Sequence, residues 1–373
     1  MEALFGNLLN LNYQQLVMWC IGGLLIFLAI SKDMEPALLL PMGFGAILVN
    51  LPMSGAVTQI VDGVKETGVI DLLFDSGIAN ELFPLLLFIG IGAMIDFGPL
   101  LTNPKLMLFG AAAQFGIFFT FSLASLLGFP VKDAASISII GAADGPTSIF
   151  VANFLKSNYI GPIIVAAYSY MALVPIVQPP VIRMITTKQE RSIRMEYANA
   201  DVSRPTRILF PIFVTIIAGV VSPRSVALIG FLMFGNLIRE CGVLGSLSET
   251  AQKALANLVT LLLGITVSAR MQAEAFLNPQ TLMILGLGLI AFVFDTIGGV
   301  LFAKVLNLFS KKKINPMIGA AGISAFPMSA RVVHKMGLAE DPQNFLLMHA
   351  AGANVSGQVA SVIAGGLLLN LLA

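Results

Sequence analysis

Apolar runs recur along this chain, several of them long enough to cross a lipid bilayer, and they constrain its fold more than any other feature. Examples are LVMWCIGGLLIFLAI (16–30), KLMLFGAAAQFGIFFTFSLASLLGF (105–129), ILFPIFVTIIAGVV (208–221) and TLMILGLGLIAFVFDTIGGVLF (281–302). Hydrophobic residues make up 57% of the chain and charged residues 11%, whereas a soluble domain has about 25% charged residues. Because hydrocarbon offers no partners to backbone polar groups, such runs must form helices. The sequence therefore predicts an all-α polytopic membrane protein, and its net charge of +1 indicates no nucleic-acid partner.

One acidic residue, Asp144, lies in the apolar stretch SISIIGAADGPTSIFVANF (136–154). A bare charge in hydrocarbon is costly, so membrane proteins keep one only with a cation, a proton or a substrate as its partner. Glycine and proline interrupt the helix here, and Thr147 and Ser148 add oxygen atoms. Oxygen ligands suit a hard cation such as sodium. We interpret Asp144 as a cation ligand, while Thr147 and Ser148 fit equally well as caps of a half-helix.

The two halves of the chain resemble each other. LLFIGIGAMIDFGPLLTNPKLMLFG (86–110) is similar to LLLGITVSARMQAEAFLNPQTLMILG (261–286), and the string IGAA occurs at 140–143 and again at 318–321. The offsets are 175 residues for the Asn-Pro pairs and 178 for IGAA. This agreement favours an ancient duplication over chance similarity between apolar helices.

Two segments broken by glycine and proline, 134–153 and 314–330, are interpreted as re-entrant hairpins. With hairpins at these places, sixteen basic residues lie on the cytoplasmic side and five outside, as the positive-inside rule requires. The two copies then face opposite ways. Inverted repeats with broken helices are typical of ion-coupled carriers, in which the breaks meet at the membrane midplane. We therefore expect an elevator-transporter-like fold that brings Asp144 and Ser324 toward one centre.

These boundaries divide the chain into five parts. They are N-terminal spans with an external loop (1–85), a first membrane repeat (86–183), a cytoplasmic loop (184–207), connecting spans (208–253) and an inverted second repeat (254–373).

Four strings of this chain resemble the β subunit of the sodium ion-translocating biotin-dependent decarboxylases, which act on oxaloacetate, methylmalonyl-CoA, glutaconyl-CoA or malonate. The strings are GAADGPTSIF, VAAYSYMALVPIVQPPVIRMITTKQER, INPMIGAAGISAFPMSARVVHKMG and MHAAGANVSGQVAS. The resemblance implies a membrane enzyme that releases carbon dioxide from carboxybiotin and couples this step to sodium export.

The resemblance also implies partners and a location. The carboxyltransferase α subunit would load biotin on a carrier subunit or domain, and a small membrane subunit, γ or δ, would complete the complex. The family suggests a homotrimer in the bacterial cytoplasmic membrane. The compact chain is more similar to the acyl-CoA branches than to the longer oxaloacetate ones, which hints at methylmalonyl-CoA or glutaconyl-CoA as the substrate of the whole complex.

The family's functional positions fall on seven residues of this chain. Asp144 would be the main sodium ligand, with Asn354, Asn315 and Ser324 or nearby carbonyls completing the shell. Arg331 would bind the carboxylate of carboxybiotin, with Asn315 and Gly319 beside it. Catalysis would involve Arg331, Ser324 and Tyr170, whose phenol would relay the proton consumed in decarboxylation. The full list is Asp144, Tyr170, Asn315, Gly319, Ser324, Arg331 and Asn354.

Other interpretations stay open at this point. An inverted repeat and an intramembrane aspartate serve a sodium-coupled carboxylate carrier or a sodium/proton antiporter equally well. Tyr170 fits a tyrosine packed between helices, and Arg331 fits an ordinary cytoplasmic basic residue. Asp295, inside another apolar span, is either a second ion or proton site or the partner of a neighbouring helix.

Overall fold

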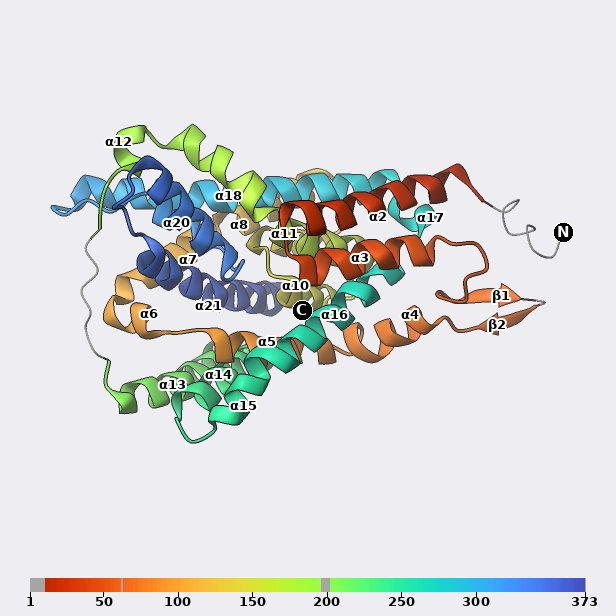
Figure 1. Ribbon diagram of the computed structural model, residues 1–373, viewed down its shortest axis with the longest axis horizontal. Helices are drawn as coiled ribbons and strands as arrows, with labels where there is room; N and C mark the ends of the chain where they lie inside the picture. The colour runs from red at the N-terminus through yellow and green to blue at the C-terminus, as the bar shows by residue number, and fades with distance from the viewer. Residues whose placement is uncertain (1–10, 62, 196–201, 373) are drawn as a thin grey trace.

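A computed structural model describes residues 11–61, 63–195 and 202–372, and this part of the chain is almost entirely helical (Figure 1). Seven of its helical segments are long and apolar enough to span a bilayer, which confirms the prediction of an all-α polytopic membrane protein. The spans are Tyr13–Lys32, Pro104–Leu126, Ile160–Ile185, Arg204–Val221, Gly245–Arg270, Pro279–Phe309 and Leu347–Leu372.

In the first half of the chain, the described residues form two strands and ten α-helices, with shorter π and 3-10 segments labelled η. In chain order the elements are α2 (Tyr13–Lys32), α3 (Pro36–Val49), β1 (Gln59–Val61), β2 (Val64–Glu66), α4 (Val69–Leu73), η1 (Phe74–Ile78), α5 (Leu82–Met94), α6 (Gly98–Thr102), η2 (Pro104–Leu106), α7 (Met107–Ala113), α8 (Phe115–Leu126), α9 (Val131–Ser138), η3 (Ile139–Ala142), α10 (Gly145–Phe154) and α11 (Ile160–Ile185).

The second half is helical in all its described elements. They are α12 (Lys188–Arg191), α13 (Arg204–Val221), η4 (Pro223–Ser225), α14 (Val226–Glu240), α15 (Gly245–Thr250), η5 (Ala251–Leu255), α16 (Ala256–Val267), η6 (Ser268–Arg270), α17 (Ala273–Phe276), α18 (Pro279–Phe309), α19 (Met317–Ala320), α20 (Met328–Glu340) and α21 (Leu347–Leu372).

The two strands form a small antiparallel hairpin in which Gln59 pairs with Glu66. It lies at the right-hand end of Figure 1, near α4 and α17, whereas α12, α20 and the start of α13 lie toward the opposite end. That opposite end carries ion pairs of basic residues, such as Lys304 with Glu190 at 3.1 Å.

The segment from α9 to α10 folds back on itself as a hairpin. Its helix ends at Ala143, which adopts left-handed backbone angles (φ 51°, ψ 45°), and restarts at Gly145. Its two open ends are tied together, because Asp133 on α9 accepts hydrogen bonds from the Ser157 hydroxyl (2.7 Å) and the Asn158 amide (2.9 Å) beyond α10. The chain therefore enters and leaves this segment at the same place.

The segment from Asn315 to Asn344 is a second hairpin, made of α19, a break and α20. Both of its open ends bind one carbonyl, that of Arg191, through the Asn315 side chain (2.8 Å) and the Asn344 side chain (3.0 Å). An ion pair from Arg191 to Glu340 at 2.6 Å adds to this clamp. The described part of the predicted cytoplasmic loop thus holds the hairpin closed at its base.

Helix α11 links the bases of the two hairpins. It runs from Ile160, directly after the first base, to Ile185, shortly before Arg191 at the second. Its 26 residues span about 39 Å, so the hairpins open toward opposite ends of the molecule. Their tips meet, because the Ser324 amide donates a hydrogen bond to the Ala142 carbonyl at 3.0 Å.

The helices pack as two groups. In one, which we call the outer group, α3 packs on α2 and α16, and α5 packs on α14 and α16, with α13 on α14. In the other, the core group, α18 packs on α8, α11 and α19, and α21 packs on α7 and α20. In Figure 1 the outer helices α13, α14 and α15 lie along the lower edge, below α6 and α21.

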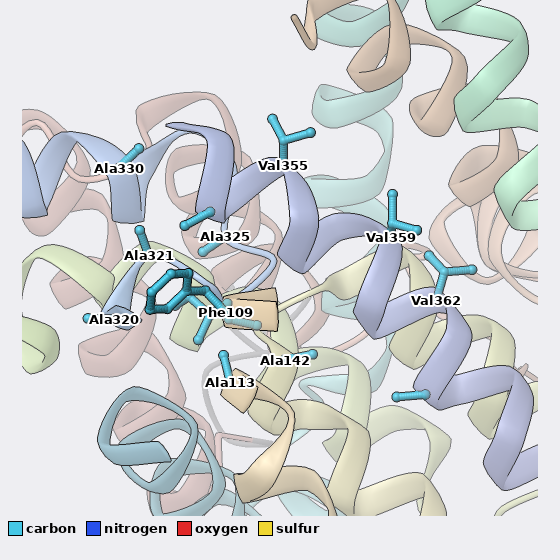
Figure 2. Close-up of a cluster of buried hydrophobic side chains, with 14 of the residues drawn as sticks. Phe109, Ala113, Ala142, Ala320, Ala321, Ala325, Ala330, Val355, Val359 and Val362 are labelled. Atoms are coloured by element: carbon cyan, nitrogen blue, oxygen red, sulfur yellow. The ribbon is translucent and has the colours of Figure 1, made fainter. Parts of the chain in front are cut away.

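Small side chains allow the core group to close around the hairpin tips. Figure 2 shows Phe109 of α7 beside Ala320 and Ala321 of the second hairpin, with Ala142 of the first hairpin close by. A Cβ atom on Gly322 would overlap the backbone carbonyl of Phe109. The backbones here are in direct contact, which leaves no space for larger residues.

We predict that Gly319→Ala strongly destabilises the protein. A Cβ on Gly319 would overlap the carbonyl of Gly299 on α18, and a Cβ on Gly299 would overlap the carbonyl of Gly319. Overpacking of this kind costs about 1–3 kcal/mol or more, so the melting temperature in detergent should fall clearly. Gly286→Ala is the matched control, since nothing lies within 4 Å of that position on the same α18. Equal melting temperatures for the two variants would contradict this packing.

Candidate functional site

Asp144 is buried at the tip of the first hairpin, with 3% of its surface exposed. It is the N-cap of α10, and its carboxylate accepts hydrogen bonds from the Thr147 amide (3.3 Å) and the Thr147 hydroxyl (2.7 Å). The Ser361 hydroxyl donates a third hydrogen bond at 3.0 Å. Ser148 caps the helix differently, by donating to the Asp144 carbonyl at 2.8 Å. These neutral donors leave the negative charge of an ionised Asp144 without a counter-charge among the contacts of its side chain.

One face of α21 points at the meeting place of the two tips. Asn354, Gln358 and Ser361 follow each other at i, i+4 and i+7, the spacing of a single helix face. The Asn354 amide donates to the Ile323 carbonyl at 2.6 Å, and the Gln358 amide donates to the Ser324 carbonyl. A single helix therefore supports the second tip and also contacts Asp144.

Ser324 binds this centre through its side chain and its backbone. Its hydroxyl donates to the Gly357 carbonyl at 3.0 Å, while its amide makes the tip-to-tip hydrogen bond. Asp144, Tyr168, Ser324 and Gln358 all line one cavity of about 210 Å³, which we call the aspartate cavity. Its other wall comes from the outer group, including Leu38 of α3 and residues of α5 and α16, so the cavity lies between the two groups.

Three buried oxygen atoms near the hairpin tips lack hydrogen-bond partners. They are the Asn354 Oδ1, the Gln358 Oε1 and the Tyr168 hydroxyl. Buried polar atoms are rarely left unpaired, and each such case calls for an explanation. Because the two amide oxygens can only accept and a buried carboxylate lies close by, the arrangement is suited to a small cation that coordinates oxygen.

A second cavity, of about 440 Å³, lies beside α20. Three basic residues line it, Arg183, Arg331 and Lys335, so we call it the cationic cavity. Its remaining wall is largely apolar, with Pro175, Pro179, Met328, Val332, Met336 and Ala339, while Asp33 and Glu35 bring acidic groups. Positive charges beside an apolar wall fit an anionic ligand with a nonpolar body.

Three of the predicted site residues lie elsewhere. Tyr170 donates its hydroxyl to the Leu285 carbonyl on α18 and belongs to the lining of neither cavity. Asn315 is fully buried at the base of the second hairpin, where its amide donates to the Arg191 and Ile193 carbonyls. Gly319 packs against Gly299. The structure thus brings together Asp144, Ser324 and Asn354 and places Arg331 in the neighbouring cavity.

Asp295 is fully buried within α18. One of its carboxylate oxygens accepts hydrogen bonds from the amides of Gly116 and Ile117 at the start of α8. The other oxygen has no hydrogen-bond partner and faces Gly141 of the first hairpin. The geometry is that of an acidic residue pairing with a neighbouring helix N-terminus, the alternative that the sequence left open.

Three residues at the hairpin tips were not predicted from the sequence. Gln358 and Ser361 share the helix face of Asn354, and their i, i+4, i+7 spacing in an apolar helix was the signal that would have found them. Tyr168 contacts Gly145, where a Cβ would overlap its ring. Residues two apart on a helix point in different directions, so Tyr168 and Tyr170 could not both face Asp144.

Comparison with known proteins identifies the family. The family model described as "Na+-transporting oxaloacetate decarboxylase beta subunit" matches residues 14–372. The methylmalonyl-CoA decarboxylase subunit beta of Propionigenium modestum is 48% identical over 97% of this chain and 96% of its own length. The glutaconyl-CoA decarboxylase subunit beta of Acidaminococcus fermentans is 48% identical over 95% of this chain and 92% of its own.

A third relative has a different substrate in its name. The oxaloacetate decarboxylase beta chain 2 of Salmonella typhi is 45% identical over 97% of this chain and 96% of its own length. Relatives of all three kinds therefore match nearly the whole chain. This chain belongs to the family of β subunits of the sodium-transporting decarboxylases.

Proposed function

We propose that this chain is the membrane subunit that releases carbon dioxide from carboxybiotin and uses the reaction to export sodium. The observation that carries the proposal is the pair of adjacent cavities. One holds a buried carboxylate among unpartnered oxygen atoms and suits a cation, and the other holds three basic residues and suits an anion. A sodium-coupled carrier, the rival that the sequence left open, has no support in the names of the relatives, which are decarboxylase subunits.

Sodium, the transported substrate, would bind at the hairpin tips. Asp144 supplies the charge, and the free Oδ1 of Asn354 and Oε1 of Gln358 supply neutral oxygens. Ser324 contributes through the backbone contact that holds the tips together. The half-helix η3 ends at this place, so the carbonyls at its C-terminus add negative potential. We assign Asn315 a supporting role at the hairpin base instead of a place in the ligand shell.

Carboxybiotin, carried on a separate subunit, would bind in the cationic cavity. The volume of about 440 Å³ lies within the usual range for small-molecule sites. Arg331 would pair with the carboxylate in a fixed fork, and Arg183 and Lys335 would add positive potential. The apolar wall would accept the uncharged ring system. Gly319 would act indirectly, by letting α19 pack on α18.

Decarboxylation requires a proton on the biotin nitrogen that loses the carboxyl group. Tyr170 is a weak candidate for this relay, because its hydroxyl binds the Leu285 carbonyl outside both cavities. Tyr168 has an unpartnered hydroxyl and lines the aspartate cavity. We therefore propose that Tyr168, which lines the cavity next to the carboxybiotin site, is better placed than Tyr170 for a proton relay, and that Tyr170 holds α11 against α18.

The two halves of the chain are proposed to be inverted repeats. Each contains a short helix, a long span, a re-entrant hairpin and a final helix of 26 residues, α11 in one half and α21 in the other. Coupling would follow from an elevator-like shift of the core group, with both hairpin tips, along the outer group. Moving one sodium ion against 100 mV costs about 2.3 kcal/mol, so the shift must depend on the decarboxylation state.

The complete enzyme would contain further chains. The name "beta subunit" implies a multisubunit complex, and we propose a carboxyltransferase α subunit, a biotin carrier and a small γ or δ membrane subunit as partners, with a homotrimeric arrangement of this chain. The bacterial cytoplasmic membrane is the proposed location. The carboxyltransferase would select the substrate, and the chain's compactness favours an acyl-CoA.

We predict that Asp144→Asn abolishes sodium-dependent decarboxylation. The isosteric amide removes the charge that would bind the cation, and a loss of about 3 kcal/mol corresponds to a drop of roughly a hundredfold or more in turnover. Carbon dioxide release from carboxybiotin and sodium-dependent thermal stabilisation of the purified complex measure the two effects. Asp295→Asn is the control, a buried acid outside both cavities, which should lower stability but leave the half-saturating sodium concentration unchanged. Normal sodium-stimulated turnover in the Asp144 variant would refute the assigned site.

Arg331→Lys should raise the KM for carboxybiotin by roughly tenfold, since lysine keeps the charge but loses the bidentate fork. Steady-state kinetics of the complex with free carboxybiotin measures this change. Arg194→Lys is the control, because Arg194 lies at the same end of the molecule in an exposed pair with Asp341. An unchanged KM in the Arg331 variant would move the carboxybiotin site away from this cavity.

Linking the two groups should stop sodium export. Asn370 of the core group lies 3.5 Å from the Ser222 hydroxyl at the end of α13 in the outer group. In a chain without Cys20 and Cys241, cysteines at 222 and 370 joined by a short crosslinker would hold the groups together. Cysteines at 119 and 294, where two stacked rings lie within the core group, provide the control pair. Full sodium transport after crosslinking 222 to 370 would exclude the elevator-like shift.

A further inference from the structure

The cationic cavity and the aspartate cavity are neighbours that share one wall residue. Among the described residues, Glu35 is the one that lines both. It lies in the turn between α2 and α3, which Figure 1 places between the two ends of the molecule and not at either of them. An acidic side chain therefore stands at the boundary between the proposed sodium site and the proposed carboxybiotin site.

The rest of the boundary confirms that the cavities adjoin. On α11, Met171 lines the aspartate cavity and Pro175, one helical turn further on, lines the cationic cavity. At the start of α20, Pro327 lines the aspartate cavity and Met328 lines the cationic cavity. The partition is thus one residue thick at α20 and one turn thick at α11, and these neighbours of Glu35 are uncharged.

The backbone at Glu35 is unusual for its sequence. Glu35 adopts left-handed angles (φ 38°, ψ 60°) and is followed by Pro36, which opens α3. Left-handed angles disfavour residues other than glycine and asparagine, and the residue before a proline prefers an extended conformation. The turn presents a half-buried carboxylate at a position where glycine would fit the backbone more easily.

Several charges act on Glu35. Burial raises the pKa of Glu35, the Arg331 guanidinium opposes that rise, and Asp33 adds to it. Arg183 on α11 and Lys335 on α20 line the same cationic cavity, and Asp144 and Tyr168 lie in the other. Arg331 is thus the cation that most stabilises an ionised Glu35. It is also the proposed partner of the substrate carboxylate.

We infer that Glu35 passes sodium from the cationic cavity to Asp144. Glu35 and carboxybiotin compete for Arg331, and sodium passes when carboxybiotin occupies Arg331. The inference rests on the proposed function. Without substrate, three basic residues repel an approaching cation, and the potential of Arg331 offsets the charge of Glu35. When the substrate carboxylate occupies Arg331, that offset disappears and Glu35 attracts sodium. The cation then has a carboxylate on each side of the partition.

Substitution of Glu35 tests the inference by separating sodium entry from sodium binding. In the reconstituted complex, Glu35→Gln should raise the sodium concentration for half-maximal carbon dioxide release by roughly tenfold and leave the maximal rate within about twofold. The sodium concentration that half-saturates thermal stabilisation, an equilibrium quantity independent of the route, should stay within about twofold. Glu35→Asp should restore much of the kinetic effect, since it keeps the carboxylate.

Glu81→Gln is the matched control, because Glu81 is also a half-buried N-cap residue with left-handed backbone angles, at the start of α5, and lines neither cavity; it should behave like the unmodified chain. The melting temperature in potassium buffer reports whether each variant is folded. An unchanged half-maximal sodium concentration in Glu35→Gln would overturn the inference. A parallel loss of the sodium-dependent thermal stabilisation would also overturn it, because Glu35 would then be a permanent sodium ligand. Failure of the unmodified complex to release carbon dioxide from carboxybiotin would instead refute the proposed function, while the stabilisation measurements would still report on sodium.

Discussion

The hydrogen bond from the Ser324 amide to the Ala142 carbonyl joins the tips of two hairpins that enter from opposite ends of the molecule. In hydrocarbon an unpaired backbone group costs several kcal/mol, so a broken helix is stable only where another group satisfies it. Here the amide of one tip donates to the carbonyl of the other. Helix α21 satisfies the Ile323 and Ser324 carbonyls through the side-chain amides of Asn354 and Gln358. The proposed cation site is a consequence of this arrangement, since the breaks that need partners also expose oxygen atoms.

The same dependence explains the composition of the core. Two backbones can touch only where side chains are absent or small, which is why Gly319 faces Gly299 and Gly322 faces Phe109. The alanines drawn in Figure 2 fill the remaining space without separating the tips. Close backbone contact also joins α5 to α14 in the outer group, where a Cβ on Gly92 or Gly235 would overlap a carbonyl of the facing helix. Hydrophobicity is thus enough to form the membrane spans, while glycine sets how closely the helices approach at the centre and between α5 and α14.

This division also decides how much the sequence could predict. The membrane class and the two broken segments followed from apolar runs and from glycine and proline, while the role of Asp144, expected from the cost of an intramembrane charge, stays a prediction. Asn315 was expected in the ligand shell because it precedes the second break, yet it lies at the far end of that half-helix and binds the Arg191 carbonyl. No local pattern distinguishes the base of a hairpin from its tip. No sequence pattern pointed to Glu35 either, because its proposed role depends on cavities that are built by α11, α16 and α20.

Under the proposed function, Arg331 and Asp144 have to be kept apart. If the two side chains touched, they would form a buried ion pair, and each would lose the free charge with which it is proposed to attract its ligand. Arg331 lies one helical turn after Pro327, on the cationic side of the partition, whereas Asp144 lies on the other side. With the opposite charges kept apart, a bound anion in one cavity and a bound cation in the other stabilise each other across a thin wall. We propose that this mutual stabilisation is the physical form of the coupling between decarboxylation and sodium transport in this fold.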